Sequence, residues 1–154
     1  GESGGYKLDY KYIIAYYQNL IKQYDLKLLG IGYDPHNADA FLSDLAVFGV
    51  DMVEIVQSAR SLNDATVDFA LEVDGGNIIY NKNNTLLTWS MINAVKVSNS
   101  FGEIKIDKER RERRIDPCDA VICSHKLAMR RTESVNYEQA MSDYLKMMGW
   151  TEKE

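Results

Sequence analysis

Two acidic positions in the sequence have the residue types and context needed for metal chemistry. Asp34 follows an apolar stretch, residues 26–33, which predicts a buried parallel strand that ends at Asp34-Pro35. Ligands bind at the carboxyl ends of strands in open α/β sheets. Asp116 and Asp119 are three residues apart at the start of a predicted helix, so their side chains point to one side. Such carboxylates suit hard divalent cations, and two ions together support phosphodiester hydrolysis.

Each of these positions also has an ordinary structural interpretation, which is the favoured one when the residue is taken alone. Asp34-Pro35 is a typical turn before a helix, and Asp116 and Asp119 suit the positive end of a helix dipole. Other chemistries have less support. The two histidines, His36 and His125, are not at metal-binding spacing with a cysteine, and no GxxxxGK[ST] phosphate loop or GxGxxG motif is present. Nucleotide hydrolysis within this chain is therefore not expected.

The basic residues are concentrated in one part of the chain. The net charge is −5 for all 154 residues, whereas residues 96–131 carry a net charge of +4. A polyanion could bind to this part while the rest of the chain stays acidic. On charge alone, a solvated loop is the favoured alternative.

The composition fits one globular domain, or one domain with a terminal appendage. Hydrophobic residues make up 45% of the chain, and no stretch approaches the roughly 18 uncharged apolar residues that a membrane helix needs. Cys118 and Cys123 are five residues apart, a spacing that places them on different faces of a helix. A disulfide is therefore not expected, and a cytoplasmic location suits this use of cysteine.

The apolar periodicity predicts alternating helices and strands, and hence an α/β fold with a mainly parallel sheet. We expect residues 28–33 and 53–56 to form adjacent parallel strands, joined by a right-handed crossover through a helix over residues 37–48. Asn63 is expected to cap a third helix, and Asn136 a last helix over residues 137–148. The remaining expected elements are a helix over 9–24, strands over 77–80, 94–97 and 103–106, an apolar segment over 86–92, and a helix from Asp116.

Three segments together resemble the C-terminal nuclease domain of tailed-bacteriophage terminase large subunits. They are GIGYDPHNADAFLSDLAVFGVDMVEIVQ, NIIYNKNNTLLTWSMINAVKV and IKIDKERRERRIDPCDAVICS. The motifs that carry the resemblance are Tyr33-Asp34-Pro35, Val56-Gln57, Asn84 to Trp89 with Asn93, and Lys108 to Asp116. Their order and spacing agree with the family over about residues 5–129, and the ordered set is more specific than any one motif.

The resemblance implies an RNase H-like fold of the resolvase/integrase type, a mixed sheet flanked by helices. It also implies an endonuclease that uses two Mg²⁺ or Mn²⁺ ions to cut concatemeric double-stranded DNA in the host cytoplasm. By match, Asp34 and Asp116 would be catalytic metal ligands, and Asp119 a further metal ligand. The terminase small subunit and the portal protein would be partners.

The sequence also departs from the family pattern. A third acidic ligand and the first two strands would lie upstream of this chain, and the ATPase domain is missing. We therefore expect a partial nuclease domain over residues 1–132 and a helical appendage over residues 133–154. A strand edge left unpaired by such a truncation would favour self-association, and activity without the upstream ligand is left open.

Two other functions are kept as alternatives. One is a docking or DNA-binding module without catalysis, and the other is a different RNase H-like nuclease such as a junction resolvase. In the nuclease interpretation, the basic loop before Asp116 would lie beside the scissile phosphate. The alternative is that this loop is only solvated. The residues expected to contact DNA are Lys105, Lys108, Arg110, Arg111, Arg113 and Arg114.

Overall fold

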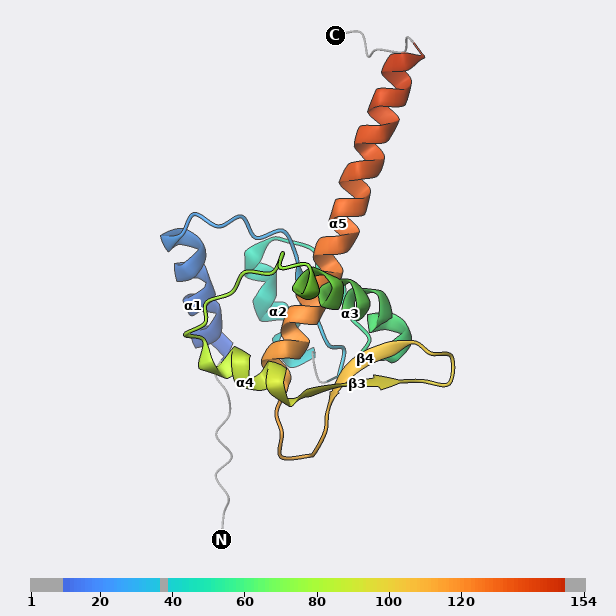
Figure 1. Ribbon diagram of the computed structural model, residues 1–154. Coiled ribbons are helices and arrows are strands. Elements are labelled where there is room, and N and C mark those ends of the chain that lie inside the picture. The colour runs from blue at the N-terminus through green and yellow to red at the C-terminus, as the bar shows by residue number, and fades with distance from the viewer. Residues whose placement is uncertain (1–9, 37–38, 149–154) are drawn as a thin grey trace. The chain divides into compact units, whose positions relative to one another are not determined.

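The computed structural model describes residues 10–36 and 39–148, without the side chains of residues 39, 40 and 131–137. The chain divides into two compact units, unit 1 over Gly1–Ile55 and unit 2 over Val56–Glu154. Each unit is described by itself below, with the elements labelled as in Figure 1.

Unit 1 contains a parallel pair of strands between helices. Its elements are α1 (Tyr10–Gln23), β1 (Ile31–Tyr33), α2 (Asp39–Leu45), the 3-10 turn η1 (Ala46–Phe48) and β2 (Met52–Glu54). The two strands pair in parallel with Gly32 opposite Val53, which confirms the predicted pairing. β1 is shorter than expected, and residues 26–30 have no neighbouring strand within the described part of the chain.

The helix between the two strands ends where the sequence predicted. Gly49 adopts a left-handed conformation with φ 61°, and its N–H donates to the carbonyl of Ala46 at 3.1 Å. Such a conformation suits glycine, which has no Cβ. In the same unit, α1 packs on α2 with the rings of Tyr10 and Phe41 5.3 Å apart. The connection between β1 and β2 therefore brings the second strand beside the first.

Unit 2 combines an antiparallel hairpin with three helices. Its elements are α3 (Ala59–Asp74), α4 (Thr85–Asn93), β3 (Ala94–Ser98), β4 (Ile104–Lys108) and α5 (Asp116–Met147). The predicted hairpin is confirmed, with Lys96 opposite Ile106. The buried side chains of this unit come mainly from α3 and from the start of α5: Leu62, Ala65, Phe69, Ile115, Cys118 and Ile122.

The start of α3 differs from the sequence prediction. The helix begins at Ala59, and its cap is Ser58, whose Oγ accepts a hydrogen bond from the N–H of Ser61 at 3.1 Å. Asn63 was wrongly expected at this position because serine and asparagine are about equally good caps. Instead Asn63 lies within the helix, and its Oδ1 accepts a hydrogen bond from the N–H of Ile104 at 2.9 Å. This bond ties α3 to β4.

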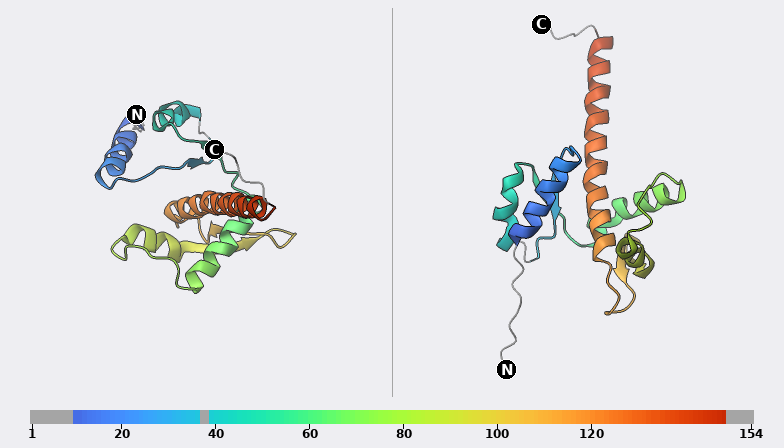
Figure 2. Two further views of the ribbon diagram at one scale, coloured as in Figure 1. Left: turned by 90° about the horizontal axis from the view of Figure 1, so that it is seen from above. Right: turned by 90° about the vertical axis from the view of Figure 1, so that its left-hand side faces the viewer.

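Two further expectations are wrong. Residues 77–80 form no strand, and Ile79 is 95% exposed. The last two expected helices are one helix, α5, because no glycine or proline interrupts the sequence between Cys118 and Met148. Figure 2 shows the second half of α5 extending beyond α3 and α4.

Some expectations stay predictions. The division into a domain over residues 1–132 and an appendage over residues 133–154 stays a prediction. α5 runs past residue 132 without a break. In the described residues β1 is hydrogen-bonded to β2 on one side, and self-association through its other edge stays a prediction. No helix among the described residues is both long and apolar enough to cross a bilayer.

The buried thiol of Cys118 allows a pH-dependent test of the packing of α5. Burial raises the pKa of Cys118 above its usual value of 9.0, and the negative charge of Asp119 raises it further. The folded state holds this proton more tightly than the unfolded state. The contribution of Cys118 to the free energy of unfolding is therefore fully present below about pH 9, and it is lost as the pH rises through the folded pKa. We expect urea denaturation to show this loss in the wild type and a smaller loss in Cys118→Ala.

The matched control for this experiment is Cys123→Ala, which removes a half-buried thiol from the same helix. This variant should keep the pH dependence of the wild type. Equal alkaline loss of stability in the wild type and in Cys118→Ala would contradict the prediction.

Candidate functional site

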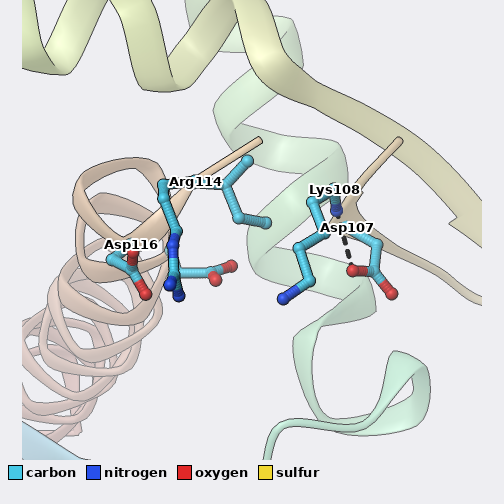
Figure 3. Close-up of a pocket in the computed structure, with 6 residues that line it drawn as sticks. Asp107, Lys108, Arg114 and Asp116 are labelled. Carbon is cyan, nitrogen blue, oxygen red and sulfur yellow. Dashed lines mark hydrogen bonds between the residues drawn. The ribbon is translucent and has the colours of Figure 1, made fainter. Parts of the chain in front are cut away.

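A pocket in unit 2 lies where β4 ends and α5 begins. Its lining residues are Asp107, Lys108, Arg114, Ile115, Asp116 and Asp119. Figure 3 shows the lysine and arginine side chains with the aspartates around the pocket. The cavity volume is about 90 Å³. Since one water needs about 10–15 Å³ on this measure, the pocket has room for several waters or a hydrated ion.

The start of α5 positions two of the carboxylates. Ile115 is buried, and its carbonyl accepts the first helical hydrogen bond, from the N–H of Asp119 at 2.9 Å. Asp116 and Asp119 are both in the first turn of α5, with Pro117 between them. Asp116 is exposed and Asp119 is half-buried. The positive end of the helix dipole stabilises negative charge at this position.

The end of β4 positions the third carboxylate. Asp107 is half-buried, and its Oδ1 accepts a hydrogen bond from the backbone N–H of Lys108 at 2.7 Å, drawn in Figure 3. The sequence analysis missed Asp107. Side chains alternate between the two faces of a strand, so Asp107 shares a face with Lys105 in residues 104–108. This alternation is the sequence signal that could have identified Asp107.

The loop between β4 and α5 is held by Asn93, the last residue of α4. Asn93 is only 4% exposed. Its Nδ2 donates to the carbonyl of Arg114 at 3.3 Å, and its Oδ1 accepts from Nη1 of Arg113 at 3.2 Å. Nε of Arg113 is also 4.0 Å from Oε2 of Glu109. One buried amide thus fixes the two residues that lead into Ile115 and the first turn of α5.

The residues that the sequence singled out as ligands belong to different units. Asp116 and Asp119 line one pocket of unit 2, whereas Asp34 belongs to unit 1. Asp34 is exposed directly after β1, and its Oδ1 accepts a hydrogen bond from the N–H of His36 at 3.0 Å. This is the turn that the Asp-Pro sequence indicated.

The six basic residues proposed to contact DNA have different environments. Lys108 and Arg114 line the pocket, and Arg110 and Arg111 are exposed on the loop. Lys105 lies on β4, where its Nζ donates to the carbonyl of Gln57 at 3.2 Å. An ammonium group has three donors, so this bond does not use up its capacity.

The pocket places three carboxylates beside two cationic side chains. Carboxylate oxygens are ligands for Mg²⁺ and Mn²⁺, whereas lysine and arginine bind phosphate oxygens. Within residues 10–36 and 39–148, no group of three or more His, Cys, Asp or Glu side chains is arranged to hold a metal ion. The chemistry of the donors fits a divalent cation, and the described side chains do not form a complete set of ligands.

A family model for the endonuclease domain of the terminase large subunit matches residues 2–132. The chain therefore belongs to the terminase large subunit endonuclease domain family. No curated protein matches the chain.

A solved structure agrees with this family. The crystal structure of the HK97 bacteriophage large terminase matches with a TM-score of 0.68 and 26% sequence identity, over 80% of this chain and 26% of that chain. The fold is thus the RNase H-like fold of terminase nuclease domains. The chain spans about a quarter of the length of the large terminase that it matches.

The role of Asn93 can be tested by truncating its side chain. Asn93→Ala leaves the carbonyl of Arg114 and the guanidinium of Arg113 without their amide partner. Loss of such a buried partner typically costs about 1–3 kcal/mol of unfolding free energy. We expect a loss of this size by urea denaturation, and faster trypsin cleavage within residues 108–114, which are rich in arginine.

The matched control is Asn83→Ala, which removes an exposed amide from the turn before α4. It should change neither the stability nor the rate of cleavage. An Asn93→Ala variant as stable and as resistant to trypsin as the wild type would show that the amide does not hold the loop.

Proposed function

We propose that this chain is a metal-dependent DNA endonuclease domain that cuts concatemeric double-stranded DNA during phage genome packaging. The observation that carries the proposal is the pocket at the start of α5, which lies within the part of the chain matched by the terminase endonuclease family. Phosphodiester cleavage requires ligands for metal ions and a surface that binds phosphate, and this pocket contains side chains of both kinds.

The proposed metal ligands are Asp34 and Asp116, with Asp119 at the edge of the site, and the proposed ions are two Mg²⁺ or Mn²⁺. Asp116 and Asp119 support this proposal because they share a pocket and offer only oxygen ligands. Asp34 supports it by its place at the carboxyl end of a parallel strand, the edge where α/β sheets bind ligands. Bound ions of this kind activate a water and stabilise the leaving oxygen.

The basic side chains would hold the DNA backbone in place. Lys108 and Arg114 can contact phosphate oxygens from the wall of the pocket, and Arg110 and Arg111 can contact them from the exposed loop. Lys105 and Arg113 complete the proposed set. Contacts of this type orient the duplex without reading its sequence, so the cut would depend little on the bases at the pocket.

The same family membership supports the partners that we propose, which are the terminase small subunit and the portal protein. A second candidate function is a DNA-binding or docking module without catalysis. It is favoured by one observation, that the described residues contain no complete group of three metal ligands. The two functions differ in whether the chain binds Mn²⁺ and breaks a phosphodiester bond.

The proposed role of Asp116 predicts a specific loss of activity. Asp116→Asn keeps the size of the side chain but removes the negative charge that a divalent ion needs. We expect weaker Mn²⁺ binding by calorimetry, and at least about a hundredfold slower nicking of supercoiled plasmid in Mn²⁺.

The matched control is Asp74→Asn, which makes the same change at an exposed carboxylate at the end of α3. It should bind Mn²⁺ and nick plasmid like the wild type. A wild-type chain that binds DNA but neither binds Mn²⁺ nor nicks it would support the non-catalytic module instead.

The proposed role of the loop predicts a change in salt dependence. Arg110→Ala combined with Arg111→Ala removes two exposed charges and leaves the bonds of Asn93 to Arg113 and Arg114 in place. Each lost phosphate contact lowers the log–log salt slope by about 0.9. We expect weaker binding to all duplexes alike, and a slope lower by about 1–2 in fluorescence anisotropy titrations.

A double variant of equal charge change, Arg60→Ala with Lys82→Ala, serves as the control because both side chains are exposed in unit 2 outside the loop. This control variant should have a log–log salt slope of DNA binding closer to the wild-type slope than the loop variant has. If both double variants lower the slope equally, the loop is only part of a general charge effect.

A further inference from the structure

The tip of the β3–β4 hairpin is a tightly bonded turn. Oδ1 of Asn99 accepts hydrogen bonds from the N–H groups of Phe101 and Glu103, both at 3.0 Å. The Nδ2 of Asn99 donates to Oε2 of Glu103 at 2.6 Å. Gly102 closes the turn with φ 79°, and its N–H donates to the carbonyl of Asn99 at 3.1 Å. The N–H of Asn99 also donates to the carbonyl of Glu103 at 3.0 Å, so five hydrogen bonds to or from Asn99 fix the turn that carries Phe101.

The end of β4 next to the tip is also fixed to the rest of unit 2. The N–H of Ile104 donates to Oδ1 of Asn63 on α3 at 2.9 Å, and Nζ of Lys105 donates to the carbonyl of Gln57 at 3.2 Å. β4 packs along α3, and in Figure 1 the turn between β3 and β4 extends beyond α3. The strand that leads from the tip is thus bonded to residues outside the hairpin.

The side chain at this tip is a phenylalanine, and Phe101 is 87% exposed. Scattered exposed hydrophobic residues are ordinary on protein surfaces. Phe101 differs because its backbone is bonded in place at the tip of the hairpin. Its neighbours Ser98 and Ser100 are exposed and small, and Lys96 is exposed on β3. The nearby carboxylate of Glu103 is held by Asn99.

We propose that Phe101 is a wedge that enters the minor groove of duplex DNA and partly unstacks a base step. This inference rests on the proposed function, since it takes DNA as the ligand of unit 2. Proteins that kink DNA insert apolar side chains such as phenylalanine or leucine between base pairs. The serine hydroxyls and Lys96 supply hydrogen-bond donors for the phosphates that flank the groove.

The hairpin also sets the distance between the wedge and the pocket. Phe101 lies in the turn six residues before Asp107, so the two residues are at most about 20 Å apart. This length covers about six base pairs of duplex. The unstacked step would therefore lie within about half a helical turn of the phosphate that the pocket holds.

Duplexes that carry 2-aminopurine at successive positions provide the test, because the fluorescence of this base rises when it is unstacked. With the whole chain, we expect a rise of about twofold at one step, and loss of that rise in Phe101→Ala. The DNA affinity of Phe101→Ala should fall by about five- to tenfold. Phe101→Leu should keep most of both signals, since leucine also serves as a wedge.

The matched control is Ile79→Ala, which removes another highly exposed apolar side chain of unit 2 and should change neither signal. Both variants should unfold like the wild type, because neither side chain is buried. If the wild type binds and nicks DNA but Phe101→Ala gives the same fluorescence and affinity, the wedge is wrong and the nuclease proposal stands. A wild type that does not bind duplex DNA at all would overturn both.

Discussion

The buried amide of Asn93 is the interaction on which the candidate site depends. β4 carries Asp107 to one side of the pocket, and α5 carries Asp116 to the other side. The loop that joins them is rich in charge and has no apolar side chain before Ile115. Its closure therefore relies on hydrogen bonds, and the bonds from Asn93 to Arg113 and Arg114 provide them next to α5. Because the amide of Asn93 is buried, these partly buried bonds hold the loop more firmly than fully exposed bonds would.

The balance of charge in this pocket explains how three carboxylates can share it. Lys108 and Arg114 lie in the same pocket as the carboxylates, and the helix dipole of α5 adds positive potential at Asp116 and Asp119. These positive groups reduce the repulsion between the aspartates when no cation is bound. The same groups would attract a DNA phosphate. They would therefore both stabilise the pocket and bind the proposed substrate.

The sequence predicted the parts of the structure that depend on local patterns. The parallel pairing of β1 with β2 follows from a strand–helix–strand spacing, and the end of the helix before Gly49 follows from the preference for glycine in a left-handed conformation. The family could be recognised because its motifs are spread along the chain in a fixed order. Asp116 and Asp119 could be placed together because both belong to one helical turn.

The parts that the sequence did not predict depend on contacts between distant residues. Asn63 binds Ile104 across 41 residues, and Asn93 binds Arg114 across 21. No local pattern distinguishes an asparagine that caps a helix from one that ties two elements together, since the same amide group serves both purposes. The continuity of α5 was missed because of a local signal. Asn136 was taken as the cap of a new helix, although no residue before it ends the helix that starts at Asp116.

The central claim is that Asp34 and Asp116 hold metal ions together. Crystals of the chain grown with Mn²⁺ would test it most directly, because the anomalous scattering of manganese locates the ions without reference to the protein. The account predicts anomalous peaks within coordination distance, about 2–2.5 Å, of carboxylate oxygens of both Asp34 and Asp116. Manganese bound elsewhere, or these two carboxylates well over 10 Å apart, would contradict it, since two ions about 4 Å apart could not bridge such a gap.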